Sequence, residues 1–155
     1  MNKPSPLQPG MDAPFFSSID QNGKTFDSKS LIGSRYLIYF YPRDLTPGCT
    51  TEACELRDAY HEFSNQNTLI LGVSTDSQKS HRKFSDKYNL PFPLLVDQNH
   101  SIAEAFGVWG EKKFMGRTFE GVHRMSFLVG KDGKIKKTFE KVKPADHARQ
   151  VLQEL

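Results

Sequence analysis

The stretch Phe40–Cys54, FYPRDLTPGCTTEAC, joins an apolar strand to a turn and then to a helix. The run from Tyr36 to Tyr41 is apolar throughout, which predicts a strand covered on both faces. Two prolines and a glycine follow, and these residues are typical of turns. Cys49 comes at the predicted start of the helix, and Cys54 is the only other cysteine. Free N–H groups and the helix dipole favour a thiolate at such a position, and the thiolate is the reactive form.

The apolar residues after the turn recur with the period of a helix that packs on a sheet. They are Cys49, Ala53, Leu56, Tyr60 and Phe63. We therefore expect one helix that continues to about Ser64. On an intact helix the Cα atoms of Cys49 and Cys54 are about 8–9 Å apart, whereas a disulfide spans roughly 4.4–6.8 Å. The two cysteines can bond only if the first turn unwinds, which favours a movable redox pair over a static structural disulfide.

The rest of the chain alternates strands and helices and then ends in a hairpin and a helix. Leu69 to Ser74 is the next strand, which completes a βαβ unit with parallel strands. A second helix begins at Asp76 or Ser77 and continues to about Tyr88. A short strand, Leu94 to Val96, and a short helix that ends at Gly107 follow.

Two strands, Met125 to Val129 and Ile135 to Phe139, flank a turn and predict an antiparallel hairpin. Pro144 opens a last helix. A βαβ half followed by a ββα half is the thioredoxin arrangement. We therefore expect an α/β, thioredoxin-like fold with a central mixed sheet flanked by helices. Asn22-Gly23 adds an N-terminal hairpin. Residues 1–10, with three prolines, predict a loose tail, and residues 1–155 read as a single domain.

Composition excludes several classes of function. The chain has 21 basic and 18 acidic residues among 155, and this net charge of +3 is spread out, so we expect no nucleic-acid partner. Apolar runs are too short for a membrane span, and the N-terminus lacks the apolar core of a signal peptide. We therefore expect a cytoplasmic protein, in which two cysteines suggest catalysis or sensing rather than a disulfide scaffold. The five histidines lie about 20 residues apart, so no zinc-site spacing is present, and we predict neither metal nor cofactor.

The residues around Cys49 resemble a known family. Pro42-x-x-x-Thr46-x-x-Cys49 is similar to the active-site signature of the peroxiredoxins. Cys54 resembles the resolving cysteine of the peroxiredoxin Q group, also called bacterioferritin comigratory proteins. Arg124, just before a predicted strand, matches the arginine of that group, and Gly107–Lys112 is similar as well. The resemblance runs from about Pro14 to the C-terminus.

This resemblance implies a role for each residue of the motif. Cys49 is expected to be the peroxidatic nucleophile, which becomes a sulfenic acid, and Cys54 to resolve it to an intramolecular disulfide. Thr46 is expected to place its hydroxyl beside the sulfur, although it also fits as a helix cap. Pro42 is expected to shield the thiolate from water. Arg124 is expected to supply a permanent positive charge to the thiolate and the developing oxyanion.

The resemblance also implies the substrates and partners. It predicts a monomeric peroxidase for hydrogen peroxide and organic hydroperoxides, recycled by thioredoxin or a similar dithiol. Glu52 is expected to support the site, either by pairing with Arg124 or by interacting with the first-turn amides, and a solvated carboxylate at a helix start is its other interpretation. A second functional class stays open, namely a redox-sensing interaction module that uses the same disulfide as a switch.

Overall fold

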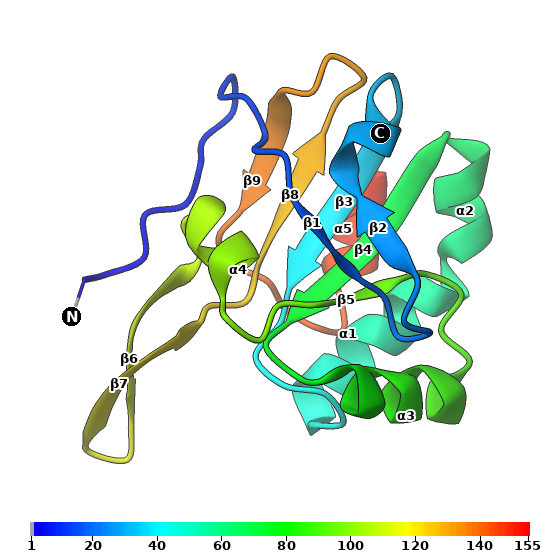
Figure 1. Ribbon diagram of the computed structural model, residues 1–155. Helices are drawn as coiled ribbons and strands as arrows, with labels where there is room; N and C mark the ends of the chain where they lie inside the picture. The colour runs from blue at the N-terminus through cyan, green and yellow to red at the C-terminus, as the bar shows by residue number, and fades with distance from the viewer. Residues whose placement is uncertain (1) are drawn as a thin grey trace.

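Strand β3 (Arg35–Phe40) is the centre of a five-stranded sheet in the computed structural model, which describes residues 2–155 (Figure 1). Its neighbours are β4 (Thr68–Ser74), which is parallel, and β8 (Met125–Val129), which is antiparallel. The outer strands are β5 (Leu94–Val96), parallel to β4, and β9 (Ile135–Phe139), antiparallel to β8. This order, β5-β4-β3-β8-β9, is the predicted mixed sheet of a thioredoxin-like fold.

Helices and small strands surround this sheet. The helices are η1 (Ser28–Leu31), α1 (Pro47–Asp58), α2 (Tyr60–Asn65), α3 (Gln78–Tyr88), α4 (Ser101–Ala105) and α5 (His147–Leu152). Two hairpins complete the fold: β1 (Ser17–Ile19) with β2 (Thr25–Asp27), and β6 (Trp109–Phe114) with β7 (Arg117–Val122). The predicted N-terminal hairpin around Asn22-Gly23 is therefore confirmed.

The core consists of two apolar clusters, one on each face of the sheet. Leu37, Tyr39 and Tyr41 point to the first cluster, which also contains residues of α1, α2, α3 and α5. The alternate residues of β3 point to the second, where α4, η1 and the β1–β2 hairpin cover the sheet. Residues 36–41 are at most 5% exposed, which agrees with the prediction of a strand buried on both faces.

Two predicted helix boundaries are wrong. The helix after Cys49 breaks at Ala59, where φ is −92° and ψ is 4°, and α2 begins at Tyr60. Phe63 of α2 is completely buried, whereas Tyr60 is only half-buried. The last helix begins at His147 rather than at Pro144. Residues 144–146 form a turn that brings the His147 ring into the core, where it is buried.

From residue 2 onward the N-terminal segment is a docked strap, so the prediction of a loose tail is wrong for residues 2–10, and Met1 lies outside the described residues. Ser5 N–H donates to the Gly107 carbonyl at 2.9 Å, and Leu7 N–H donates to the Phe106 carbonyl at 3.2 Å. Gly107 has φ +77°, and a Cβ added there would lie 1.9 Å from the Ser5 carbonyl oxygen. The strap therefore depends on a position that only glycine can occupy.

The β6–β7 hairpin was not predicted. It extends away from the main sheet in Figure 1, at the lower left. Its turn is made by Met115 and Gly116, both with positive φ, and residues 113–120 are exposed. Three consecutive charged residues interrupt β6 and two charged residues lie in β7, so the sequence lacks the apolar pattern that marks a buried strand. Among residues 2–155, none of the helices is both long and apolar enough to cross a membrane.

Replacement of Gly107 by alanine should release the strap. The substitution adds the strain of a left-handed alanine, about 1–2 kcal/mol, and a clash with the Ser5 carbonyl. Gly133→Ala is a matched control, because Gly133 also has φ +77° but an added Cβ would meet no atom within 4 Å. Urea denaturation should show a larger loss for Gly107→Ala, and limited proteolysis should cut residues 2–8 faster. Equal losses in the two variants would contradict a docked strap.

Candidate active site

Cys49 lies at the start of α1 and is almost completely covered. It is the third residue of the helix and is 1% exposed. Thr46 is the N-cap residue, with extended backbone at φ −82° and ψ 155°. Because β3 ends at Phe40 and α1 begins at Pro47, the short loop between them delivers Cys49 to the carboxyl end of the central strand. This is the predicted place for a reactive thiol.

Arg124 joins the thiol to a buried carboxyl group. Its Nη2 donates to Cys49 Sγ at 3.2 Å, and its Nη1 donates to Glu52 Oε1 at 2.7 Å. Arg124 belongs to the two-residue connection between β7 and β8, so the sheet carries it to the helix start. The structure therefore brings together three predicted site residues. Cys49 and Glu52 are 3 positions apart in the sequence, and Glu52 and Arg124 are 72 positions apart.

Burial and neighbouring charges shift the pKa values of Arg124 and Glu52. Burial lowers the pKa of Arg124, but Glu52 and Cys49 outweigh it, and the net shift is upward, so the guanidinium stays charged. Burial raises the pKa of Glu52 to about 7, although the charge and hydrogen bond of Arg124 lower it. Glu52 is 0% exposed, and its Oε2 makes no hydrogen bond to any side chain or backbone group within residues 2–155. The expectation that Glu52 pairs with Arg124 is correct, and the alternative of a solvated carboxylate is wrong.

Sequence reasoning missed the residue that allows Arg124 to approach. A Cβ added to Gly48 would lie 3.2 Å from Arg124 Nη2 and 3.8 Å from Pro144 Cγ. Gly48 therefore leaves room for the guanidinium beside the helix start. Lys112 of β6 was also missed. Its Nζ donates to the Val122 carbonyl at 2.8 Å. Burial, followed by the charge of Arg124, lowers the pKa of Lys112, whereas Cys49 raises it, so the ammonium lies within the field of the site.

Two further buried groups lie behind the site. Tyr39 of β3 is 0% exposed, and its hydroxyl lacks a hydrogen-bond partner among the described residues. Burial, and then the charges of Glu52 and Cys49, raise the pKa of Tyr39 well above its ordinary value. His147 Nε2 is 2.7 Å from the Ser126 hydroxyl, and burial lowers the pKa of His147 to about 4. Both side chains are therefore neutral near pH 7 and leave the negative charges to the residues around Arg124.

The other predicted residues lie nearby without contacts that reveal a role. Thr46 is the N-cap residue of α1, as predicted, but its hydroxyl donates to the Arg43 carbonyl at 2.8 Å and makes no capping hydrogen bond. Pro42 is half-buried in the loop after β3. Cys54 is half-buried, five residues after Cys49 on the intact helix, and both cysteines are free thiols.

This arrangement suits nucleophilic thiol chemistry. A buried sulfur at a helix start, hydrogen-bonded to a fixed guanidinium, is held in the environment that favours a thiolate. The same guanidinium can stabilise negative charge that develops on an oxygen bound next to the sulfur. Cys54 supplies a second thiol on the same helix.

The comparisons with known proteins agree with this chemistry. The AhpC/TSA family model matches residues 9–138. A protein called putative peroxiredoxin bcp from Haemophilus influenzae is 47% identical over 148 residues, which cover 96% of each chain.

Two solved structures of Xanthomonas campestris proteins are similar as well. A cysteine-to-serine variant of peroxiredoxin Q superposes with a TM-score of 0.89 at 36% identity, and the match covers 96% of this chain and 97% of the other. Bacterioferritin comigratory protein, whose structural study concerns alkyl peroxide reduction, has a TM-score of 0.86 at 35% identity, and the match covers 98% of this chain and 96% of the other.

The buried Glu52 carboxyl should make stability depend on pH. Its pKa of about 7, against an ordinary value of 4.5, means that the folded state keeps a proton that the unfolded state has lost. The free energy of unfolding should therefore fall as pH rises from 4.5 to 7, by about 2–3 kcal/mol, relative to Glu52→Gln. Urea denaturation at a series of pH values measures this difference. Glu55→Gln, an exposed change in the same helix, should show no such slope. A flat difference for Glu52→Gln would refute the assignment.

Proposed function

The chain belongs to the AhpC/TSA family and is a thiol peroxidase of the peroxiredoxin type, and on this basis we propose a peroxiredoxin Q mechanism with an intramolecular disulfide. The observation that carries the proposal is the hydrogen bond from Arg124 to the Cys49 sulfur, 3.2 Å long, at the start of α1. The substrate is a peroxide and the electrons come from a thiol reductant.

In the first step the Cys49 thiolate attacks one oxygen of the peroxide. The S–O bond forms while the O–O bond breaks, and the leaving oxygen takes a proton to become water or an alcohol. Arg124 stabilises the thiolate and then the departing oxygen. Glu52 keeps the guanidinium in place through the 2.7 Å bond to Nη1. Thr46 places its hydroxyl beside the substrate, and Pro42, which lacks an N–H, keeps water from the sulfur.

In the second step Cys54 resolves the sulfenic acid. Its thiolate attacks the Cys49 sulfur, the S–S bond forms, and the S–O bond breaks to release water. A dithiol such as thioredoxin then exchanges with this disulfide and restores both thiols. We propose hydrogen peroxide and organic hydroperoxides as substrates, in line with the alkyl peroxide activity reported for the Xanthomonas campestris relative. The single domain, the monomeric state and the cytoplasmic location stay predictions.

Peroxide turnover with a thioredoxin system tests this proposal. Cys49→Ser should abolish NADPH-coupled turnover, because the attacking sulfur is gone. Cys54→Ser should still consume one peroxide per chain and then stall as a sulfenic acid, which mass spectrometry detects. The wild type should cycle many times. One oxidation without turnover by any dithiol would favour the redox-sensing module instead, and full activity of Cys49→Ser would reject the mechanism.

Formation of the disulfide should unwind the start of α1. An intact helix holds the two Cα atoms about 8–9 Å apart, beyond the reach of a disulfide at ~4.4–6.8 Å. Hydrogen exchange should therefore become faster from Cys49 to Leu56 in the oxidised protein, while β3 stays protected. Peptide mapping should find a Cys49–Cys54 bond. Only intermolecular disulfides, or unchanged exchange in α1 after oxidation, would speak against local unwinding.

A further inference from the structure

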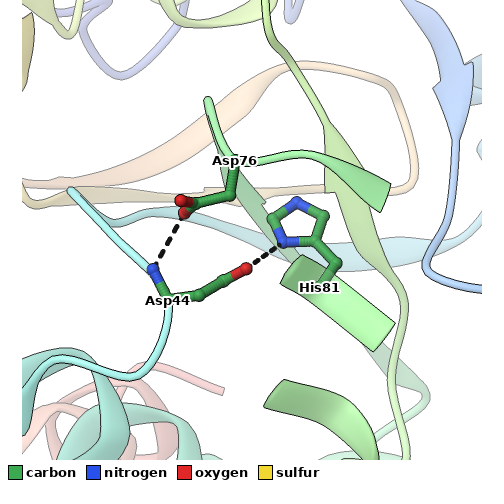
Figure 2. A group of neighbouring side chains, drawn as sticks. All are labelled: Asp44, Asp76 and His81. Atoms are coloured by element: carbon green, nitrogen blue, oxygen red, sulfur yellow. Dashed lines mark hydrogen bonds and ion pairs between the residues drawn. The ribbon is translucent and has the colours of Figure 1, made fainter. Parts of the chain in front are cut away.

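A second buried cluster lies in the loop that leads to Cys49, and the chemistry above does not use it. Asp44 belongs to this loop, Asp76 follows β4, and His81 lies in α3 (Figure 2). The side chains of His81 and Asp44 are 0% and 1% exposed, and His81 Nδ1 is 2.7 Å from Asp44 Oδ2. The cluster therefore links the loop after β3 to the helix after β4.

The partners of His81 decide how many protons its ring carries. Nδ1 faces the Asp44 carboxyl group at 2.7 Å, and Nε2 faces the Leu95 carbonyl oxygen at 2.9 Å. A neutral imidazole has one N–H, so its other nitrogen would present a lone pair to one of these oxygens. A carbonyl oxygen can only accept, which places one hydrogen on Nε2. A second hydrogen must then lie between Nδ1 of His81 and the Asp44 carboxyl group.

Asp44 has the surroundings of a carboxylate. The Tyr41 hydroxyl donates to its Oδ1 at 2.6 Å, and the Ser80 hydroxyl donates to its Oδ2 at 2.8 Å. Burial, and then the Asp44 charge, raise the pKa of Tyr41 well above its ordinary value, so Tyr41 stays a donor. Two hydroxyl donors therefore converge on the carboxyl group that faces His81 Nδ1, which is the pattern of an ionised acid. The pair is thus an imidazolium and a carboxylate with no net charge.

The second carboxyl group of the cluster has other hydrogen-bond partners. Asp76 Oδ2 accepts from Asp44 N–H at 2.8 Å and from the Ser74 hydroxyl at 2.6 Å. The three side chains do offer ligand atoms within 4.8 Å of one another. However, two ligands of a tetrahedral ion at ~2.1 Å would stand about 3.4 Å apart, whereas His81 Nδ1 and Asp44 Oδ2 are 2.7 Å apart. The separation of these two atoms therefore fits a hydrogen bond between His81 and Asp44 rather than two ligands of one metal ion.

The loop held by Asp44 contains a strained residue. Leu45 has φ +63° and is 42% exposed. A left-handed, non-glycine residue costs about 1–2 kcal/mol and persists only where the surroundings enforce it. Leu45 lies between Asp44 and Thr46, the N-cap of α1. The contacts of Asp44 therefore fix one end of the strained turn, and the start of the helix fixes the other.

We propose that His81 is a positioning residue for the peroxidase reaction. As an imidazolium it holds Asp44, and through Asp44 it keeps the strained loop in the shape that places Pro42 and Thr46 beside Cys49. This inference rests on the roles proposed above for those three residues. It predicts that loss of His81 harms the reaction with peroxide more than it harms the thiolate itself.

The protonation of His81 can be observed directly in the reduced protein. Long-range ¹H–¹⁵N spectra should show hydrogen on both ring nitrogens of His81. His61, exposed on α2, gives the reference signals of a histidine without buried partners. Asp44→Asn should leave His81 with a single ring hydrogen, because the anion that faces Nδ1 is gone. A neutral His81 in the wild type would overturn the proposal.

Two rates separate positioning from general destabilisation. Oxidation of Cys49 by hydrogen peroxide should slow roughly ten- to a hundredfold in His81→Leu, as expected when reacting groups are misplaced. Alkylation by iodoacetamide should change less than about threefold, because Arg124 still stabilises the thiolate. His81→Asn, which keeps a donor towards Asp44, should lie between His81→Leu and the wild type. Ile102→Ala, a buried change on the opposite face of the sheet, should leave both rates near those of the wild type.

Each other result contradicts a definite part of the proposal. A peroxide rate within about twofold of the wild type in His81→Leu would overturn the positioning role, since misplacement should cost more. Equal losses of both rates, or an equal loss in Ile102→Ala, would also overturn it, because destabilisation would then explain the effect. If His81→Leu does not fold, His81→Asn is judged by the same criterion. If peroxide fails to oxidise Cys49 in the wild type, the proposed function fails instead.

Discussion

The site depends on one guanidinium shared between two acidic groups. Arg124 contacts the Cys49 sulfur at 3.2 Å and the Glu52 carboxyl at 2.7 Å, and both of these residues are buried. One positive charge cannot neutralise two anions. When one of the two groups is protonated, the charge of Arg124 therefore stabilises the anion of the other group more strongly. Burial raises the pKa of Glu52 to about 7, so this carboxyl group holds a proton at pH values where an exposed glutamate has lost it. The sheet, the helix start and Gly48 all serve to keep this contact in place.

Much of the fold could be predicted because its strongest signals are local. The apolar run of β3, the helical spacing within α1 and the turn between β8 and β9 each depend on residues that are close together in the sequence. The errors arise where distant contacts decide. The strap at Ser5 depends on hydrogen bonds to residues 106 and 107, and the β6–β7 hairpin lacks a buried face. Neither leaves a periodic pattern that a reader of the sequence could find.

The residues of the candidate site also divide into those that the sequence indicates and those that only the structure reveals. Pro42, Thr46, Cys49 and Arg124 could be named because the resemblance to peroxiredoxins lies in those residues, and the family membership is now confirmed. The contact between Glu52 and Arg124 was one of two interpretations until the structure showed it. Lys112, Tyr39, His147 and the Asp44–His81 pair could not be found, because each owes its meaning to burial or to a partner on another element. A lone histidine in a helix carries no such signal.

The break at Ala59 divides the segment after Cys49 into two short helices, and it sets how far a disturbance can spread. A continuous helix melts as a cooperative unit, whereas two helices joined by a turn can open separately. If the cysteines close as proposed, fraying at Cys49 would stop before α2, and Phe63 would keep its place in the core. The break would then confine the unfolding to α1, so that repeated redox cycles would not expose the apolar core and would not promote aggregation of the protein.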